Sequence, residues 1–315
     1  MLTASYAALQ NWNILARFDY VTWGGSLMKE RDTIGFFDIL HDPMRLLSER
    51  AGRVLFERGD VSSARMTLPF VLNPEAMRRR GNYPSRYPES YRMLGLVSRV
   101  GTVFAPSDKK AAFSFDGSTQ FCLRLEERQE AVEMVAASDS PLAQYIDWKA
   151  GRFRSDTGEL LIDCREKLFE VTTPRSEGAI LDENARFAGK VVSLENKKGR
   201  NVVFVTSRDG QPLLCSRRIL LLHLTENKNS GMRFANEGRK VLLDWGKLPL
   251  LVRNGTVKAT LCGDYRKYRL YAVGVSGQRM FRITPVLNDG KVLMFDMEVH
   301  KNPKLPALVY ELVKE

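Results

Sequence analysis

The stretch Val202-Val203-Phe204-Val205-Thr206, followed by the turn Arg208-Asp209-Gly210, decides the fold class of this chain. β-Branched and aromatic residues favour strands, and an Asp-Gly pair supplies the positive φ that a tight hairpin needs. From Gly151 onward the same alternation recurs without a helical period between the turns. The other strand-like runs are 168–172, 219–224, 269–273 and 292–296, and the other glycine turns are 156–158, 198–200, 253–255, 275–277 and 288–290. Many short strands joined by glycine turns predict a mainly β fold, with a β-sandwich over residues 151–315.

The N-terminal residues follow a helical and then an alternating pattern. Residues 4–13 are rich in Ala and Leu without a breaker, which favours helix, and residues 14–21 alternate apolar and polar types, which favours a strand. After a polar loop, Asp42 is a candidate N-cap and Pro43 suits the first helical position. Apolar residues then recur at helical spacing up to Gly59, which we expect to end the helix. Helix, strand, loop and helix in this order form one step of an α/β fold.

Several phrases of the sequence resemble (β/α)8-barrel glycoside hydrolases of the β-galactosidase and cellulase-like retaining clan. The phrase from Ser5 to Asn13 resembles the passage from helix 7 to strand 8, and Asp42-Pro43 with LFERGDV at 55–61 resembles the end of helix 8. SDTGEL at 155–160, TTPR at 172–175 and the tail after residue 271 resemble the β-domains that follow such barrels. The resemblance implies a C-terminal TIM-barrel fragment at 1–62 (helix 7, strand 8, helix 8), a mixed linking segment at 63–150 and β-sandwich accessory domains at 151–315.

The resemblance also implies a function. These enzymes hydrolyse a glycosidic bond with two carboxylates, which sit at the ends of strands 4 and 7 in the family. Both positions would lie upstream of Met1, so no catalytic residue is carried over. We therefore expect the C-terminal fragment of a glycoside hydrolase acting on a polysaccharide or oligosaccharide, inactive on its own. The alternatives are a non-catalytic β-sandwich that binds carbohydrate or a partner, and a nucleic-acid binder driven by the basic half of the chain.

The candidate site residues lie at the end of the strand predicted over 14–21. Asp19, Tyr20 and Trp23 occupy that end, and functional residues of such barrels collect at the C-terminal ends of strands. In the family an aromatic residue here lines the sugar subsite, so the resemblance implies that these three bind substrate. Packing is the alternative for the aromatic residues, and Trp12 is expected in the core. The carboxylates of SDTGE at 155–159 are better explained by a turn than by acid/base chemistry.

Composition limits the partners. The net charge is +11, and nearly all of the excess lies in residues 151–315. Scattered Lys and Arg without a stripe of aromatic residues fit a solvated β-surface, so we expect carbohydrate as the ligand and no specific nucleic acid. No apolar run approaches the ~20 residues of a membrane span, which predicts no membrane partner. The pattern also predicts no metal and no cofactor, and cysteines that are buried thiols.

The remaining expectations concern packing. If a barrel is incomplete here, Leu9, Ile14, Phe18, Leu47 and Phe56 would be uncovered, which favours a homo-oligomer or assembly with another chain. His223 lies in an apolar run and is expected as a satisfied core residue. Within 63–150 the pattern predicts strands at 65–72 and 111–117 and helices at 91–100 and 124–137.

Overall fold

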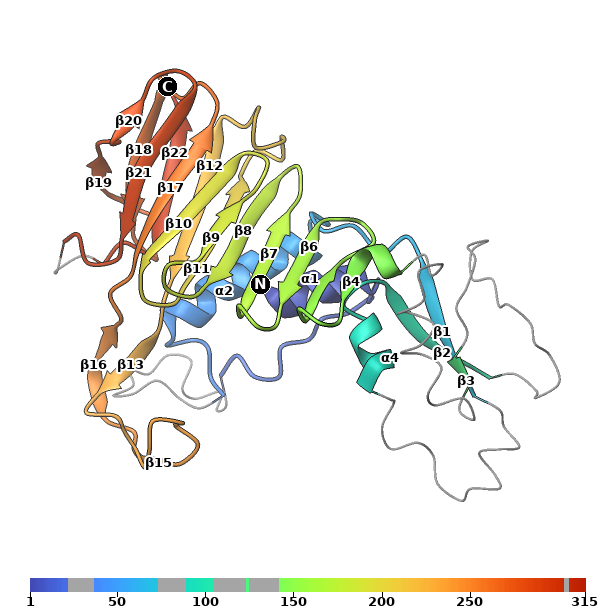
Figure 1. The fold of residues 1–315 in the computed structure, drawn as a ribbon. Coiled ribbons are helices and arrows are strands. Elements are labelled where there is room, and N and C mark those ends of the chain that lie inside the picture. The colour runs from blue at the N-terminus through green and yellow to red at the C-terminus, as the bar shows by residue number, and fades with distance from the viewer. Residues whose placement is uncertain (22–36, 73–88, 105–122, 125–141, 303–305) are drawn as a thin grey trace.

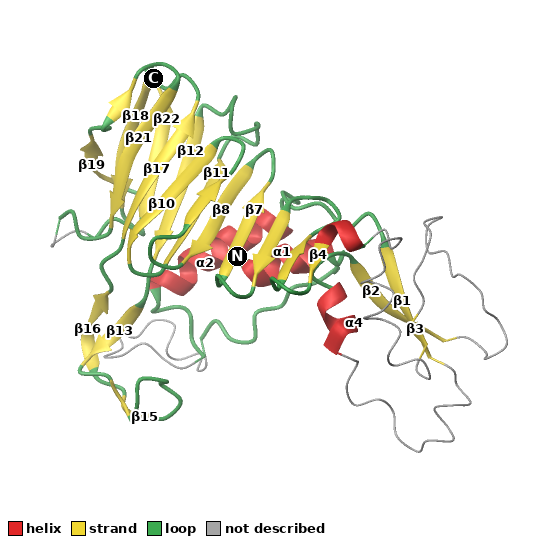
Figure 2. Ribbon diagram, in the orientation of Figure 1, coloured by secondary structure: helices red, strands yellow, loops and turns green. Residues whose placement is uncertain are grey.

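The fold is given by a computed structural model, which describes residues 1–21, 37–72, 89–104, 123–124, 142–302 and 306–315. The helical elements in these ranges are α1 (Leu2–Leu9), α2 (Pro43–Phe56), α4 (Glu89–Leu94) and the 3-10 turn η2 (Ala143–Tyr145). Strands account for far more of the described residues than helices do. α1 and α2 lie together against one face of the largest sheet, and α4 lies beside β1 and β2 (Figures 1 and 2). The chain is therefore mainly β.

Two antiparallel sheets face each other and form the sandwich (Figure 1). The larger has, in spatial order, β19 (Arg279–Ile283), β18 (Tyr268–Val273), β22 (Val309–Lys314), β12 (Arg218–Leu224), β11 (Asn201–Ser207), β8 (Ser176–Leu181), β7 (Leu168–Thr172), β6 (Leu160–Asp163), β5 (Arg152–Arg154) and β4 (Ile146–Asp147). The smaller has β20 (Leu287–Asn288), β21 (Val292–Glu298), β17 (Thr256–Cys262), β10 (Val192–Lys198) and β9 (Arg186–Ala188). All five strand-like runs predicted after Gly151 are strands, so the prediction of a β-sandwich architecture is confirmed.

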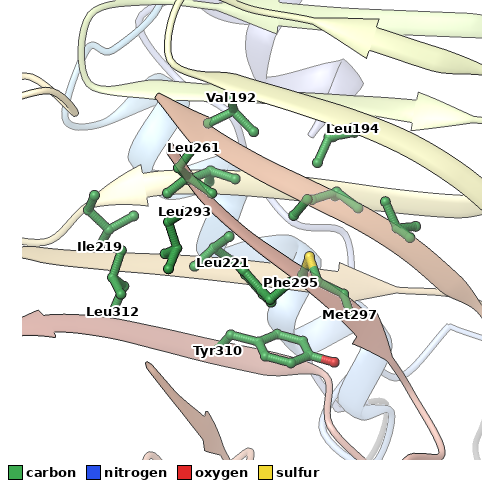
Figure 3. Packing of buried hydrophobic residues seen from close by; sticks show 14 of the residues in the cluster. Val192, Leu194, Ile219, Leu221, Leu261, Leu293, Phe295, Met297, Tyr310 and Leu312 are labelled. Atoms are coloured by element: carbon green, nitrogen blue, oxygen red, sulfur yellow. The ribbon is translucent and has the colours of Figure 1, made fainter. Parts of the chain in front are cut away.

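The space between the sheets is filled by alternating apolar side chains. Leu221 and Tyr310 of the larger sheet meet Leu261 and Phe295 of the smaller one, and the Phe295 and Tyr310 ring centroids are 6.1 Å apart (Figure 3). These four side chains are almost fully buried. Burying a side chain of this size contributes about 1.5–3 kcal/mol relative to exposure, so this core is the main source of stability for the sandwich.

A second core joins the helices to the outer face of the larger sheet. Leu9 of α1 and Leu47 and Leu55 of α2 pack with Phe169 and Phe204 of the sheet. Asp42 caps α2 as predicted, because its Oδ1 accepts a hydrogen bond from the Arg45 N–H at 3.0 Å, and Pro43 is the first helical residue. The expectation that Leu9 and Leu47 are uncovered is wrong, since the β-sheet itself buries them.

The segment between α1 and α2 differs from the prediction. Residues 14–21 form no strand, and the chain runs there as an irregular segment. Trp12, expected in the core, is 55% exposed. A strand needs a neighbouring strand to bond its backbone, and none of the described sheets reaches this segment. The local alternation of residue types was therefore misleading.

A small parallel sheet precedes the sandwich. It has the order β2 (Arg99–Phe104), β1 (Thr67–Leu72) and β3 (Leu123–Arg124), with Thr67 opposite Arg99. The strand predicted at 65–72 is confirmed, whereas the helix predicted at 91–100 ends early and gives way to β2. The predictions for 111–117 and 124–137 lie outside the described residues, apart from Arg124.

A two-part hairpin arm extends from the sandwich (Figure 1). It consists of β13 (Asn227–Ser230) paired with β16 (Lys247–Val252), and of β14 (Arg233–Phe234) paired with β15 (Leu242–Asp244). Its apolar side chains are largely uncovered: Leu243, Leu248 and Leu251 are 62%, 50% and 56% exposed. The sheet therefore covers the apolar faces of α1 and α2, whereas the apolar side chains of the arm are exposed to solvent.

Candidate functional site

The first candidate site is the junction between the helices and the sandwich, where Asp60 lies fully buried. Its carboxylate accepts hydrogen bonds from Arg58 Nε at 2.9 Å and Nη2 at 2.5 Å, and from Ser176 Oγ at 2.5 Å. Arg175 Nε lies 3.0 Å from the same carboxylate. Arg175 also donates to the backbone carbonyls of Arg58 and Gly59. This ionic cluster joins the end of α2 to the start of β8.

The SDTGE segment makes a second set of contacts at the same junction. The Asp156 carboxylate accepts from the backbone N–H groups of Arg65 at 3.1 Å and Met66 at 2.8 Å, and from Ser98 Oγ at 2.9 Å. Glu159 accepts from the backbone N–H and the hydroxyl of Ser62 at 2.7 and 2.9 Å. Because each oxygen of both carboxylates accepts a hydrogen bond, the segment links the sandwich structurally to Ser62, Arg65, Met66 and Ser98. The prediction of a structural turn here is confirmed, and Gly158 has the positive φ of 76° that such a turn needs.

The predicted substrate-binding residues lie in the irregular segment after α1. Asp19 is half-buried and Tyr20 is 47% exposed, and the Tyr20 carbonyl accepts the backbone N–H groups of Ile39 and Leu40, each at 3.2 Å. Trp23 lies outside the described residues. Asp19 and Tyr20 thus lie beside residues 37–40, and the Phe18 and Phe37 rings meet edge to face with their centroids 5.4 Å apart.

The segment around Ile14 covers the helices loosely. A cavity of about 610 Å³ separates residues 13–17 from α1 and α2, and an ion pair between Arg17 and Glu49 spans it. On the outer side, Ile14 and Phe18 are 76% and 84% exposed. This segment therefore presents apolar side chains outward, and the ion pair between Arg17 and Glu49 links it to α2.

Two buried ionisable groups serve packing. The carboxylate of Glu177 on β8 accepts the backbone N–H groups of Lys190, Val191 and Val192 at 2.8–3.2 Å and so ties the two sheets together, and burial raises its pKa. His223 on β12 places Nε2 2.8 Å from the Asn201 side-chain oxygen, and burial lowers its pKa to about 3. The expectation of a core histidine is confirmed, although His223 Nδ1 has no partner among the described residues.

Sequence reasoning missed a pocket between α2 and the larger sheet, which we call the arginine pocket. It has a volume of about 360 Å³, an apolar floor that includes Phe204 and Leu222, and a rim that includes Arg50, Arg53, Arg208 and Arg218. In the sequence, the pocket is indicated only by two pairs of arginines: Arg50 and Arg53 on α2, and Arg208 and Arg218 at the ends of the loop between β11 and β12. That signal is visible once the helix is known to cross this part of the sheet.

Other kinds of site leave no trace in the described part of the chain. No group of three His, Cys, Asp or Glu residues there is arranged to hold a metal ion, and no helix there has the length and apolarity to span a bilayer.

Cys164, Cys215 and Cys262 are free and exposed, so the prediction of buried thiols is wrong for these three. They lie at the ends of strands or in loops, where the alternating pattern does not determine burial.

Comparisons with family models, with curated proteins and with solved structures give no match for this chain.

Proposed function

We propose that this chain is a non-catalytic region of a glycoside hydrolase, in which the sandwich and its helical layer support a catalytic (β/α)8 barrel. The junction is the observation that carries the proposal. The phrases that resemble these enzymes, at 55–61, 155–160 and 172–175, are distant in sequence but meet in space: Asp60 contacts Arg175, and the Thr172 N–H donates to the Glu159 carbonyl at 2.8 Å. Contacts of this kind are what the last helix of a barrel needs in order to be held against a following β-domain.

The exposed segment after α1 supports the same proposal. Trp12, Ile14, Phe18 and Tyr20 are 55%, 76%, 84% and 47% exposed within nine residues. Exposed apolar side chains concentrated in one short segment are the kind of surface that a partner covers. In the proposal a barrel covers Ile14 and Phe18, and Asp19, Tyr20 and Trp23 form one wall of its sugar site, with the aromatic rings against the sugar C–H faces.

Neither the described segment 10–21 nor the junction supplies an acid/base pair in this arrangement. Retaining glycosidases need two carboxyl groups about 5 Å apart across the sugar. Asp19 is the only carboxylate in the described segment 10–21, and the carboxylates of Asp60, Asp156 and Glu159 at the junction already accept structural hydrogen bonds on both oxygens. The two catalytic groups therefore belong to the barrel that the proposal places on this surface.

The test begins with the transcript that encodes this chain. The full sequence of that transcript is determined first. The whole polypeptide is then purified and assayed on aryl glycosides. If the barrel is encoded separately beside it, the two chains are co-expressed and assayed together. We expect a (β/α)8 barrel with two strand-end carboxylates, measurable turnover, and protection of Ile14 and Phe18 from solvent in hydrogen exchange. A transcript without barrel strands, or a barrel that leaves both residues unprotected, would overturn the proposal.

Matched variants separate the surface from general effects of charge. Ile14→Asp with Phe18→Asp places two carboxylates on the proposed contact, whereas Leu214→Asp changes a 66% exposed leucine in the loop between β11 and β12. The double variant is expected to weaken packing of the barrel and to lower its activity. The Leu214 variant is expected to behave as the unmodified protein.

A second candidate function, a partner-binding β-sandwich, is favoured by the hairpin arm. Leu243 and Leu251 are each more than half exposed there, and Trp245 is 39% exposed. Sedimentation velocity of the purified chain is the direct measurement. Self-association that Leu243→Ser removes and Ile14→Ser does not would assign the interaction to the arm.

A further inference from the structure

The arginine pocket lies between α2 and the outer face of the larger sheet, beside the junction. Thr206 lines the pocket, and its hydroxyl accepts hydrogen bonds from Arg58 and Ser176 of the junction. One wall is α2, and the floor is formed by strands β11, β12, β22 and β18. The turn between β18 and β19, at Gly274 and Gly277, closes one end. Figure 2 shows α2 lying against one face of the larger sheet.

The floor is apolar because of the strand register. Phe204, Leu222, Val309 and Val273 stand opposite one another on four adjacent strands and therefore share one face of the sheet. Each is at most 6% exposed, and all four line the pocket. Leu47 and Val54 of α2 face them. The pocket thus has the apolar lining expected of a small-molecule site.

The rim carries an excess of positive charge. Arg53 pairs with Glu57, and Arg218 pairs with Glu311 at 2.6 Å. Arg50, on α2, and Arg208, after β11, have no carboxylate within ion-pair distance among the described residues. Both line the pocket, Arg50 from α2 and Arg208 from the position that follows β11.

Glu311 does not neutralise this excess, because two arginines share it. Its carboxylate accepts from Arg218 and from Arg279 Nε, each at 2.6 Å. Burial acts to raise the pKa of Glu311, but its hydrogen bonds to Arg279 and Arg218 outweigh burial and hold the pKa below its usual range. The single carboxylate on the rim is therefore ionised and already engaged.

We propose that the arginine pocket binds a small amphiphilic carboxylate, with an alkyl or aryl body on the apolar floor and the carboxylate between Arg50 and Arg208. Arginine suits this role because its planar guanidinium group forms paired hydrogen bonds to a carboxylate. The apolar body provides affinity through burial, and the arginines select the charge of the head group. A volume of about 360 Å³ admits a single medium-length chain or one aromatic ring system with a short tail.

Calorimetry with decanoate and decanol tests both halves of the proposal, since the two probes share a chain and differ in charge. Decanoate is expected to bind at micromolar to millimolar concentration, and decanol more weakly. In Arg50→Gln with Arg208→Gln, decanoate affinity is expected to fall about tenfold or more, while decanol affinity stays unchanged. Arg165→Gln is the matched control, because Arg165 is an exposed arginine on the turn between β6 and β7 that does not line the pocket.

A second variant and a second readout fix the location. Val54→Trp fills the pocket from a half-exposed position on α2 and is expected to abolish binding of both probes. Methyl NMR should show shifts at Val273, Val309 and Leu222 on addition of decanoate. No decanoate binding at millimolar concentration, equal affinity in the double arginine variant, or shifts confined to other methyl groups would overturn the proposal.

Discussion

Replacing Asp60 by Asn removes the only anion of the ionic cluster at the junction and keeps the shape of the side chain. The Asp60 side chain is fully buried, whereas the side chains of Arg58 and Arg175 are 27% and 33% exposed. Removing one partner of a buried ion pair costs about 3–5 kcal/mol, because the other charge stays buried without compensation. Water reaches both arginines in part, so we expect the lower end of this range, about 3 kcal/mol.

The measurement is the thermal unfolding midpoint followed by circular dichroism. A loss of about 3 kcal/mol corresponds to a fall of about 6–12 °C for a domain of this size class. Asp264→Asn is the matched control, because Asp264 forms an ion pair with Arg266 on the exposed surface and its loss should leave the midpoint unchanged. Adding Arg175→Gln to Asp60→Asn should recover part of the loss, since it removes one uncompensated cation.

The result that would refute this reasoning is a midpoint for Asp60→Asn within about 2 °C of both the unmodified chain and the Asp264 variant. Additive losses in the Asp60 and Arg175 double variant would also refute it. Either result would mean that the cluster does not hold α2 against β8, and the support it gives to the proposed function would be lost.

Three further predictions follow from the buried and exposed carboxylates and from His223. The folded-state pKa of His223 is about 3, below its ordinary value, so the unfolded chain binds a proton first as the pH falls, and the free energy of unfolding should decrease from about pH 6.5 downward. Between pH 7 and 4.5, urea unfolding of His223→Gln should show a decrease about 2–3 kcal/mol smaller than that of the unmodified chain. Asp156→Ala leaves the N–H groups of Arg65 and Met66 without their acceptor, so limited proteolysis should cut residues 62–104 faster while the sandwich stays resistant. The chain alone should not hydrolyse aryl glycosides, and turnover that Asp19→Asn abolishes would contradict the non-catalytic assignment.

The sandwich could be predicted from sequence because its signals are local. Gly158, Gly199, Gly210, Gly277 and Gly290, all placed in predicted turns, have positive φ, and the runs between the turns are strands. The cap at Asp42 is equally local, since a side chain and a backbone N–H three residues apart determine it. In each case the physical cause lies within a few residues of its effect.

The remaining features depend on distant contacts. Residues 14–21 have a strand-like pattern, but a strand forms only beside another strand, and that partner is set by the whole fold. The burial of Leu9 and Leu47 likewise depends on which sheet the helices meet. Asp19 and Tyr20 could be named as candidates because they are consecutive in the sequence. The arginine pocket could not be predicted, because it brings α2 together with residues more than a hundred positions away, and no periodic pattern in the sequence indicates that contact.

The position of β22 has a consequence for the order in which the chain can fold during translation. β22 lies between β12 and β18, with Leu312 opposite both Ile219 and Leu270. Until residues 309–314 leave the ribosome, β18 and β19 have no hydrogen-bonded link to the rest of the larger sheet. The nascent chain therefore carries two open strand edges, at β12 and β18, and both are targets for wrong pairing with other chains. Closure of the sheet is thus a late event that begins when β22 is released.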